Sequence, residues 1–118
     1  MAAPNLISTT SIIGKTRAET LTTSMTAVLT NLANSGEVHR LNVLYVTNLG
    51  IADASVSDEL YRGGVGYKIV YNLSVPVGQS IVAIGKDTSI YLEEDDSLRL
   101  SASQAGVLQY VLSYEVMS

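Results

Sequence analysis

At 118 residues, the chain has the length of one domain with a single hydrophobic core. Charged residues make up only 15% of it, against roughly 25% in a typical soluble domain, and mainly Ser and Thr replace the missing charge. The net charge of −4 and the seven scattered basic residues argue against a nucleic-acid partner. The absence of Cys excludes disulfides and thiolate metal sites.

The surface of the folded chain is expected to be covered in part by other protein chains. A free monomer usually carries more charge than this to stay soluble. No apolar run approaches the roughly 20 residues that span a bilayer, so we expect no membrane partner.

Residues 1–15 are interpreted as an N-terminal arm, and residues 16–118 as a single domain. Residues 1–5 are small and polar, lack the basic and apolar regions of a signal peptide, and indicate a flexible leader. Residues 6–13 are rich in β-branched side chains without clean alternation. This pattern fits an arm that pairs with a neighbouring subunit, and equally an ordinary edge strand, ended at residues 14–15.

Most of the remaining chain has the period of two that antiparallel strands require, because successive side chains point to opposite faces of a sheet. In residues 97–103 the alternation is unbroken, with Leu98, Leu100 and Ala102 on one face. Residues 26–32 also show helical spacing, but their Thr and Val content and the flanking strands favour a strand. The expected strands are residues 17–23, 26–32, 38–48, 54–62, 67–75, 79–84, 89–92, 97–103 and 107–117.

Two of these strands carry informative side chains. Residues 38–48 are apolar on both faces in their second half, as a strand in the middle of a sheet and covered on both sides would be. In residues 54–62, Val56 and Leu60 share a face with Asp58 between them. We expect Asp58 either to find a cationic partner or to reach water through a bulge or an edge position.

About eight antiparallel strands at regular spacing, separated by turn residues, predict an all-β fold. The expected architecture is a β-sandwich or jelly roll with an extended N-terminal arm. The glycine-rich residues 63–66 permit positive φ and predict a hairpin rather than a phosphate loop, because no helix and no Lys-Ser or Lys-Thr follows them. The acidic residues 93–96 predict a solvated turn, with a Ca²⁺ site as the weaker alternative.

The sequence contains no residue set that supplies an acid, a base and a positioned partner, so we expect no enzyme activity, cofactor or metal. His39 is the only His and is interpreted as a surface or interface imidazole. Asp58, Glu59 and Glu115 offer carboxylate pairs of the kind used in glycoside hydrolysis, but any β protein contains such pairs.

Seven Tyr, with no Phe and no Trp, are the most unusual feature of the composition. Tyr61 and Tyr91 lie near strand ends, where packing at an interface is favoured over stacking on a sugar ring. Five Tyr at apolar strand positions are expected in the core or at its rim: Tyr45, Tyr67, Tyr71, Tyr110 and Tyr114. The candidate interface residues are Leu6, Ile7, Ile12, Ile13, Tyr61 and Tyr91.

Several segments resemble a group of small structural proteins of tailed bacteriophages, particularly those that infect cyanobacteria and other aquatic hosts. The matching segments are APNLISTTSIIGKT, VHRLNVLYVTN, NLSVPVGQSIV, IYLEEDDSLRLSAS and VLQYVLSYEVMS, which together cover most of the chain. At Asp58 and Glu59 the chain is more polar than such proteins usually are.

The resemblance implies a virion component without enzyme activity, assembled in the host cytoplasm. The expected function is that of a capsid decoration (cement) protein, which stabilises the head through contacts with the major capsid protein or other virion proteins. A homo-oligomer is expected, and a trimer would suit a jelly roll. The alternatives are a neck or tail accessory protein and a carbohydrate-binding module for host attachment.

Overall fold

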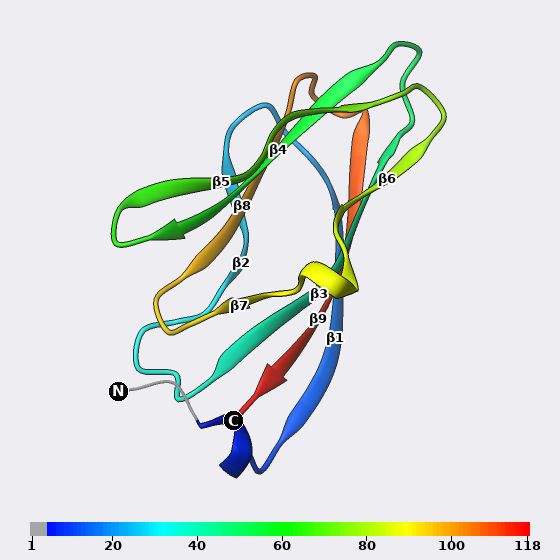
Figure 1. Ribbon diagram of the computed structural model, residues 1–118. Coiled ribbons are helices and arrows are strands. Elements are labelled where there is room, and N and C mark those ends of the chain that lie inside the picture. Colours follow the sequence, from blue (N-terminus) through cyan, green and yellow to red (C-terminus); the bar gives the residue numbers. More distant parts are fainter. Residues whose placement is uncertain (1–4) are drawn as a thin grey trace.

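The computed structural model describes residues 5–118, so most of the expected leader, residues 1–4, lies outside the described part. Two antiparallel β-sheets are stacked face to face, and the described residues contain no α-helix (Figure 1). The predicted all-β sandwich is therefore confirmed. Residues 5–118 form nine strands, and each overlaps one of the segments expected to be a strand.

The first sheet, called sheet A below, has five strands, and the second, sheet B, has four. Sheet A has the order β1 (Ile12–Thr20), β9 (Leu108–Met117), β3 (Val38–Asn48) and β6 (Ser80–Ile84), with β7 (Ile90–Leu92) also paired to β3. Sheet B has the order β2 (Thr26–Thr30), β8 (Ser97–Ala102), β4 (Ala54–Arg62) and β5 (Val65–Val75). Single 3₁₀ turns form η1 (Leu6–Ser8) and η2 (Lys86–Thr88).

The core lies between the inner faces of the two sheets, where apolar side chains from alternate strand positions meet. In β9, the predicted apolar face is confirmed, with every second residue from Leu108 to Val116 buried. The inner face of β8 is also as predicted, since Leu98 and Leu100 are almost fully buried. Each such side chain contributes roughly 1.5–3 kcal/mol by leaving water.

Two glycines form the tight turn that connects β4 to β5. Gly63 and Gly64 have φ of +59° and +81°, which glycine adopts without strain, and the predicted hairpin is confirmed. The strand favoured at residues 26–32 is likewise confirmed as β2.

Three expectations about strands and their faces were wrong. β1 continues through Gly14 and Lys15, because both residues keep their pairing with β9. β3 lies in the middle of sheet A as expected, but its outer face is open, and Tyr45 is 46% exposed. Tyr67 and Tyr71 of β5 are also exposed, whereas Tyr110 and Tyr114 lie in the core as predicted.

Candidate functional site

The outer face of sheet A carries a broad surface without charge. Antiparallel partners share a face, so the strand registers define which side chains lie side by side. One row crosses four strands as Ala18, Val111, Tyr45 and Val82. Together with the flanking rows, this uncharged face consists of Thr16, Ala18, Thr20, Val43, Tyr45, Thr47, Ser80, Val82, Gln109, Val111 and Ser113.

The centre of the uncharged face is apolar and accessible. Val82 is 54% exposed and Val111 is 41% exposed, on either side of Tyr45. Charge appears only one row further along, where Arg40 and Glu115 form an ion pair of 3.8 Å. Ser and Thr hydroxyls border the apolar centre, so the surface can bury apolar area and still make hydrogen bonds at its margin.

Beside the uncharged face, β1 is exposed along its whole length. Its strand partner is β9. The odd-numbered side chains of β1 from Ile13 to Glu19 point to the same side as the core-facing residues of β9, and they too are exposed. Arg17 and Glu19 on that side form an exposed pair of 3.0 Å, and Glu19 also accepts a hydrogen bond from the Tyr110 hydroxyl. These contacts lower the pKa of the Glu19 carboxyl, chiefly through the hydrogen bond from Arg17.

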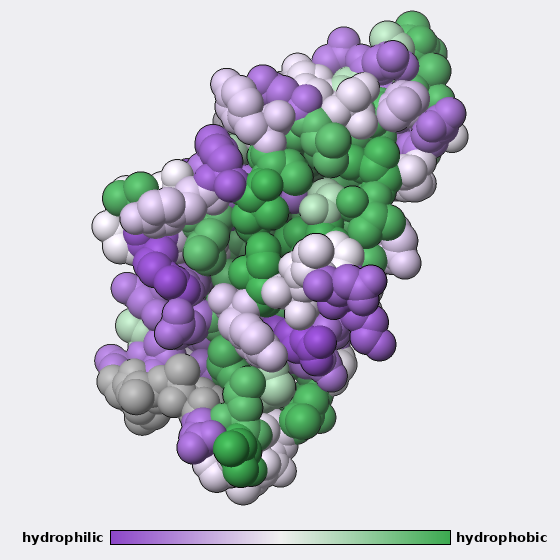
Figure 2. Space-filling view, in the orientation of Figure 1, coloured by the Kyte–Doolittle hydropathy of each residue, from purple (hydrophilic) through white to green (hydrophobic). Residues whose placement is uncertain are grey.

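Four of the sequence-predicted interface residues lie at one end of the molecule. Leu6 and Ile7 belong to η1, and Ile12 and Ile13 begin β1 next to the C-terminus, where Ser11 exchanges backbone hydrogen bonds with Ser118. All four are exposed, and Ile7 is 96% exposed. Figure 2 shows hydrophobic surface around η1 and a separate hydrophobic band in the region between β5 and β6.

The other two predicted interface residues are not brought together. Tyr61 lies in β4 of sheet B, with the guanidinium carbon of Arg99 4.4 Å from its ring centroid. Tyr91 lies in β7 of sheet A, opposite Arg40. The sequence analysis missed the uncharged face, although the outward phase of residues 107–117 contains no charge from Gln109 to Ser113.

The outer face of sheet B differs, because its charges pair with one another. The Glu59 carboxylate accepts a hydrogen bond from Lys68 Nζ at 2.6 Å and lies 3.5 Å from Arg99. Gly66 makes room for this carboxylate, since a Cβ there would overlap Glu59 Oε2. The arrangement is a self-contained ion network.

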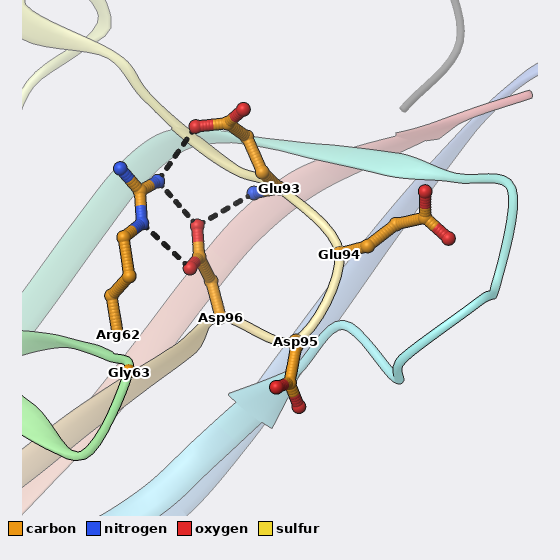
Figure 3. A pocket seen from close by; sticks show the side chains of 6 residues that line it. All are labelled: Arg62, Gly63, Glu93, Glu94, Asp95 and Asp96. Atoms are coloured by element: carbon orange, nitrogen blue, oxygen red, sulfur yellow. Dashed lines mark hydrogen bonds and ion pairs between the residues drawn. The ribbon is translucent and has the colours of Figure 1, made fainter. Parts of the chain in front are cut away.

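The acidic turn at residues 93–96 is held by hydrogen bonds and ion pairs, and is not solvated at every residue as predicted. Arg62 Nε donates to Asp96 Oδ1 at 2.8 Å, and Arg62 Nη2 donates to Glu93 at 2.8 Å (Figure 3). Asp96 is only 2% exposed and also accepts from the Glu93 backbone N–H. These carboxylates raise the pKa of Arg62 further above its usual range.

The same turn is fastened to the β2–β3 loop. The Asp95 N–H donates to the Asn31 carbonyl at 2.7 Å, and Asn31 donates back to the Asp96 carbonyl at 2.9 Å. Glu94 accepts from the Gly36 N–H at 3.0 Å. An open pocket of about 370 Å³ lies between Arg62 and this turn, and the side chains of Arg62, Glu93 and Asp96 that line it bond to one another. Within residues 5–118, no three His, Asp or Glu side chains are arranged to hold a metal ion.

Asp58 differs from both expectations for it. Its register partner Leu100 faces the core, so Asp58 also points between the sheets, and it is 0% exposed. A bulge is present, but neither carboxylate oxygen has a hydrogen-bond partner. Burial raises the pKa of Asp58 to about 7.

His39 is buried, which corrects its expected place at the surface. Its Nε2 lies 3.1 Å from Glu37, and its ring centroid is 6.0 Å from that of Tyr114. The carboxylates considered for glycoside hydrolysis do not converge, because Asp58 faces the core, Glu59 faces outward from sheet B, and Glu115 lies on sheet A.

No protein-family model matches the sequence, and no curated protein matches it. Among solved structures, the chain is similar to one from work on Bacillus endospore appendages, described there as a novel family of disulfide-linked pili. The TM-score is 0.51 at 15% identity, over 91% of this chain and 87% of the other. This similarity shows a shared fold alone. Neither helical turn in residues 5–118 could span a membrane.

Proposed function

We propose that the protein is a structural subunit of a multi-copy assembly, in which neighbouring structural proteins bury its uncharged face. The observation that carries this proposal is the row from Ala18 through Val111 and Tyr45 to Val82. It exposes apolar side chains on a regular, four-strand-wide sheet face with no charged group in the row. Exposed apolar patches of this kind mark protein–protein contacts.

The assembly that we propose is a phage particle, and the subunit is a capsid decoration protein. The sequence resemblance to small virion proteins supports this step. The fold is compatible with it, since a small sandwich can bind between larger subunits through one sheet face. Each contact stabilises the shell modestly, at about 25 cal/mol per Å² of apolar area buried, but repetition over a symmetric lattice multiplies the effect.

The structural neighbour supports the broader part of the proposal, since a chain of this fold takes part in a pilus assembly. The present chain has no Cys. Its contacts with other subunits would therefore form without disulfides, through surfaces such as the uncharged face and the exposed strand β1.

Copy number in particles tests the proposal. In particles purified from a phage that encodes this chain, quantitative mass spectrometry should find on the order of hundreds of copies, as expected for a capsid lattice. About six or twelve copies would instead place the chain in a ring at the neck or tail, the alternative location. Absence from purified particles would overturn the virion assignment altogether.

A further inference from the structure

The outer edge of β1 has backbone hydrogen-bonding groups without a strand partner in the described part of the chain. Ser11 and Ser118 exchange backbone hydrogen bonds of 3.0 and 2.9 Å, and the Leu21 N–H donates to the Leu108 carbonyl at 2.8 Å. The register between these points is continuous. Odd-numbered residues of β1 therefore direct their N–H and C=O groups toward β9. Even-numbered residues direct theirs away from β9, to the unpaired edge of the sheet.

This edge is more regular than the long edge strand β5 and longer than the edge strands β2 and β6. β1 has nine residues without a bulge in its pairing with β9, whereas β2 and β6 have five residues each. The edge strand β5 is long, but its pairing with β4 shifts register twice and Asn72 has a φ of +52°. Bulges of this kind protect an edge from pairing with another chain, and β1 has no such protection.

We propose that β1 pairs antiparallel with β1 of a second copy of this chain, around a two-fold axis at Ala18. Two five-stranded sheets A would then join into one continuous sheet. The row from Ala18 to Val82 would continue through Ala18 of the second copy, which doubles the width of the uncharged face. The inference deepens the proposed function, on which it rests for its biological role, by naming a second copy as the first partner.

Charge complementarity selects this register. Hydrogen bonding requires even-numbered residues to face even-numbered residues, as when Ala18 meets Ala18 and Thr16 meets Thr20. This alignment places Arg17 opposite Glu19 of the second copy, and Glu19 opposite Arg17. Opposite charges on directly facing positions stabilise a strand pair, and the charges on this edge therefore attract rather than repel the second copy.

The neighbouring registers are less favourable. An axis at Arg17 also pairs Lys15 with Glu19, but it places the two Arg17 residues directly opposite each other at the axis. An axis at Thr16 places Lys15 opposite Arg17. An axis at Glu19 places two carboxylates opposite each other. Like charges on directly facing positions destabilise the pair.

Cysteine cross-linking tests the inference in a chain that has no Cys of its own. In the proposed pair, the two Ala18 Cα atoms would be about 5.5 Å apart, within the roughly 4.4–6.8 Å that a disulfide spans. Ala18→Cys should therefore give a disulfide-linked dimer under mild oxidation. Thr20→Cys is the matched control, since it has the same outward phase but lies about 13 Å along the strand from its mate.

Arg17→Cys tests the register separately, and cross-linking of this variant in preference to Ala18→Cys would overturn it. Analytical ultracentrifugation of the unmodified chain should show a dimer. Ala18→Pro should convert the dimer to a monomer, because the Ala18 N–H faces outward and proline cannot donate a hydrogen bond there.

A monomer at every concentration, or open polymers instead of a dimer, would overturn the two-fold pairing. The two proposals fail separately. A monomeric chain found in particles at high copy number would contradict only the pairing, and a dimer absent from particles would contradict only the virion assignment.

Discussion

The outer faces of the two sheets contrast in how their polar groups are satisfied. On sheet B, Glu59 lies between Lys68 and Arg99, so opposite charges within the chain neutralise one another. On sheet A, the corresponding centre has no charge, and Tyr45 and Val82 are open to water. The charges of sheet B are paired within the subunit, whereas sheet A leaves apolar side chains open to water, which the proposed function expects another protein to cover.

This contrast separates folding from assembly. Substitutions that disturb the charges of sheet B should change the free energy of unfolding. Substitutions on the uncharged face of sheet A should leave it unchanged and alter association instead. Each prediction below tests one side of that separation.

The largest effect is expected at Asp58, the buried carboxylate of sheet B that has no partner. Its pKa is raised to about 7 from an ordinary value of 3.8, so the folded state binds its proton more tightly than the unfolded state. The protonated group is therefore compatible with the fold below about pH 4, and stability is lost as the pH rises toward 7. We expect this group alone to lower the free energy of unfolding by roughly 3–5 kcal/mol over that interval.

Asp58→Asn should remove the part of the pH dependence of the free energy of unfolding that Asp58 causes. Urea unfolding at a series of pH values should give a curve for the variant that is flatter between pH 4 and 7 than that of the unmodified chain. Parallel curves would mean that the carboxylate reaches water or a cation when the protein is in solution, and that sheet B satisfies all of its charges after all.

A smaller effect, about 2 kcal/mol, is expected from Gly66→Ala. The new Cβ would overlap Glu59 Oε2, so the carboxylate must leave its place between Lys68 and Arg99. Gly14→Ala is the matched control in a strand of sheet A, because nothing lies within 4 Å of its added Cβ. Equal urea midpoints for the two variants would show that the ion network contributes nothing to folding.

Arg62→Met should cost about 1–2 kcal/mol. Asp96 is 2% exposed and would retain only the Glu93 N–H as a partner of its carboxylate. The half-exposed Arg62 limits the loss, because water partly screens its pair with the acidic turn. Thermal unfolding measures the effect, and an unchanged midpoint would remove the acidic turn from the interactions that hold sheet B together.

The sequence predicts the parts of the fold that depend on neighbouring residues. Alternation identified the core faces of β8 and β9, because a period of two is a local property of an extended chain. The hairpin at Gly63 and Gly64 was also predictable, since positive φ is a property of the residues themselves.

The remainder depends on which sheet covers which face, and local pattern carries no such information. Tyr45 and Tyr71 occupy apolar strand positions, yet no second layer lies over them. Asp96 is buried because Arg62, far along the sequence, reaches its carboxylate. Alternation does place Asp58 on the core-facing side of β4 with Val56 and Leu60, but it does not show that the carboxylate lacks a partner there.

The smallest effect on folding, and the sharpest test of the contrast, is expected from Val82→Lys on the uncharged face. Val82 is 54% exposed, so the long Lys side chain reaches water and the free energy of unfolding should change by no more than about 0.5 kcal/mol. Val65→Lys on the β5 hairpin of sheet B is the matched control, since Val65 is 48% exposed. In an assembly that buries the uncharged face, the ammonium group of Val82→Lys would lose its water without gaining a carboxylate, at a cost of several kcal/mol. We therefore expect both variants to fold normally and only Val82→Lys to be missing from assembled particles, whereas equal incorporation would assign the contact surface elsewhere.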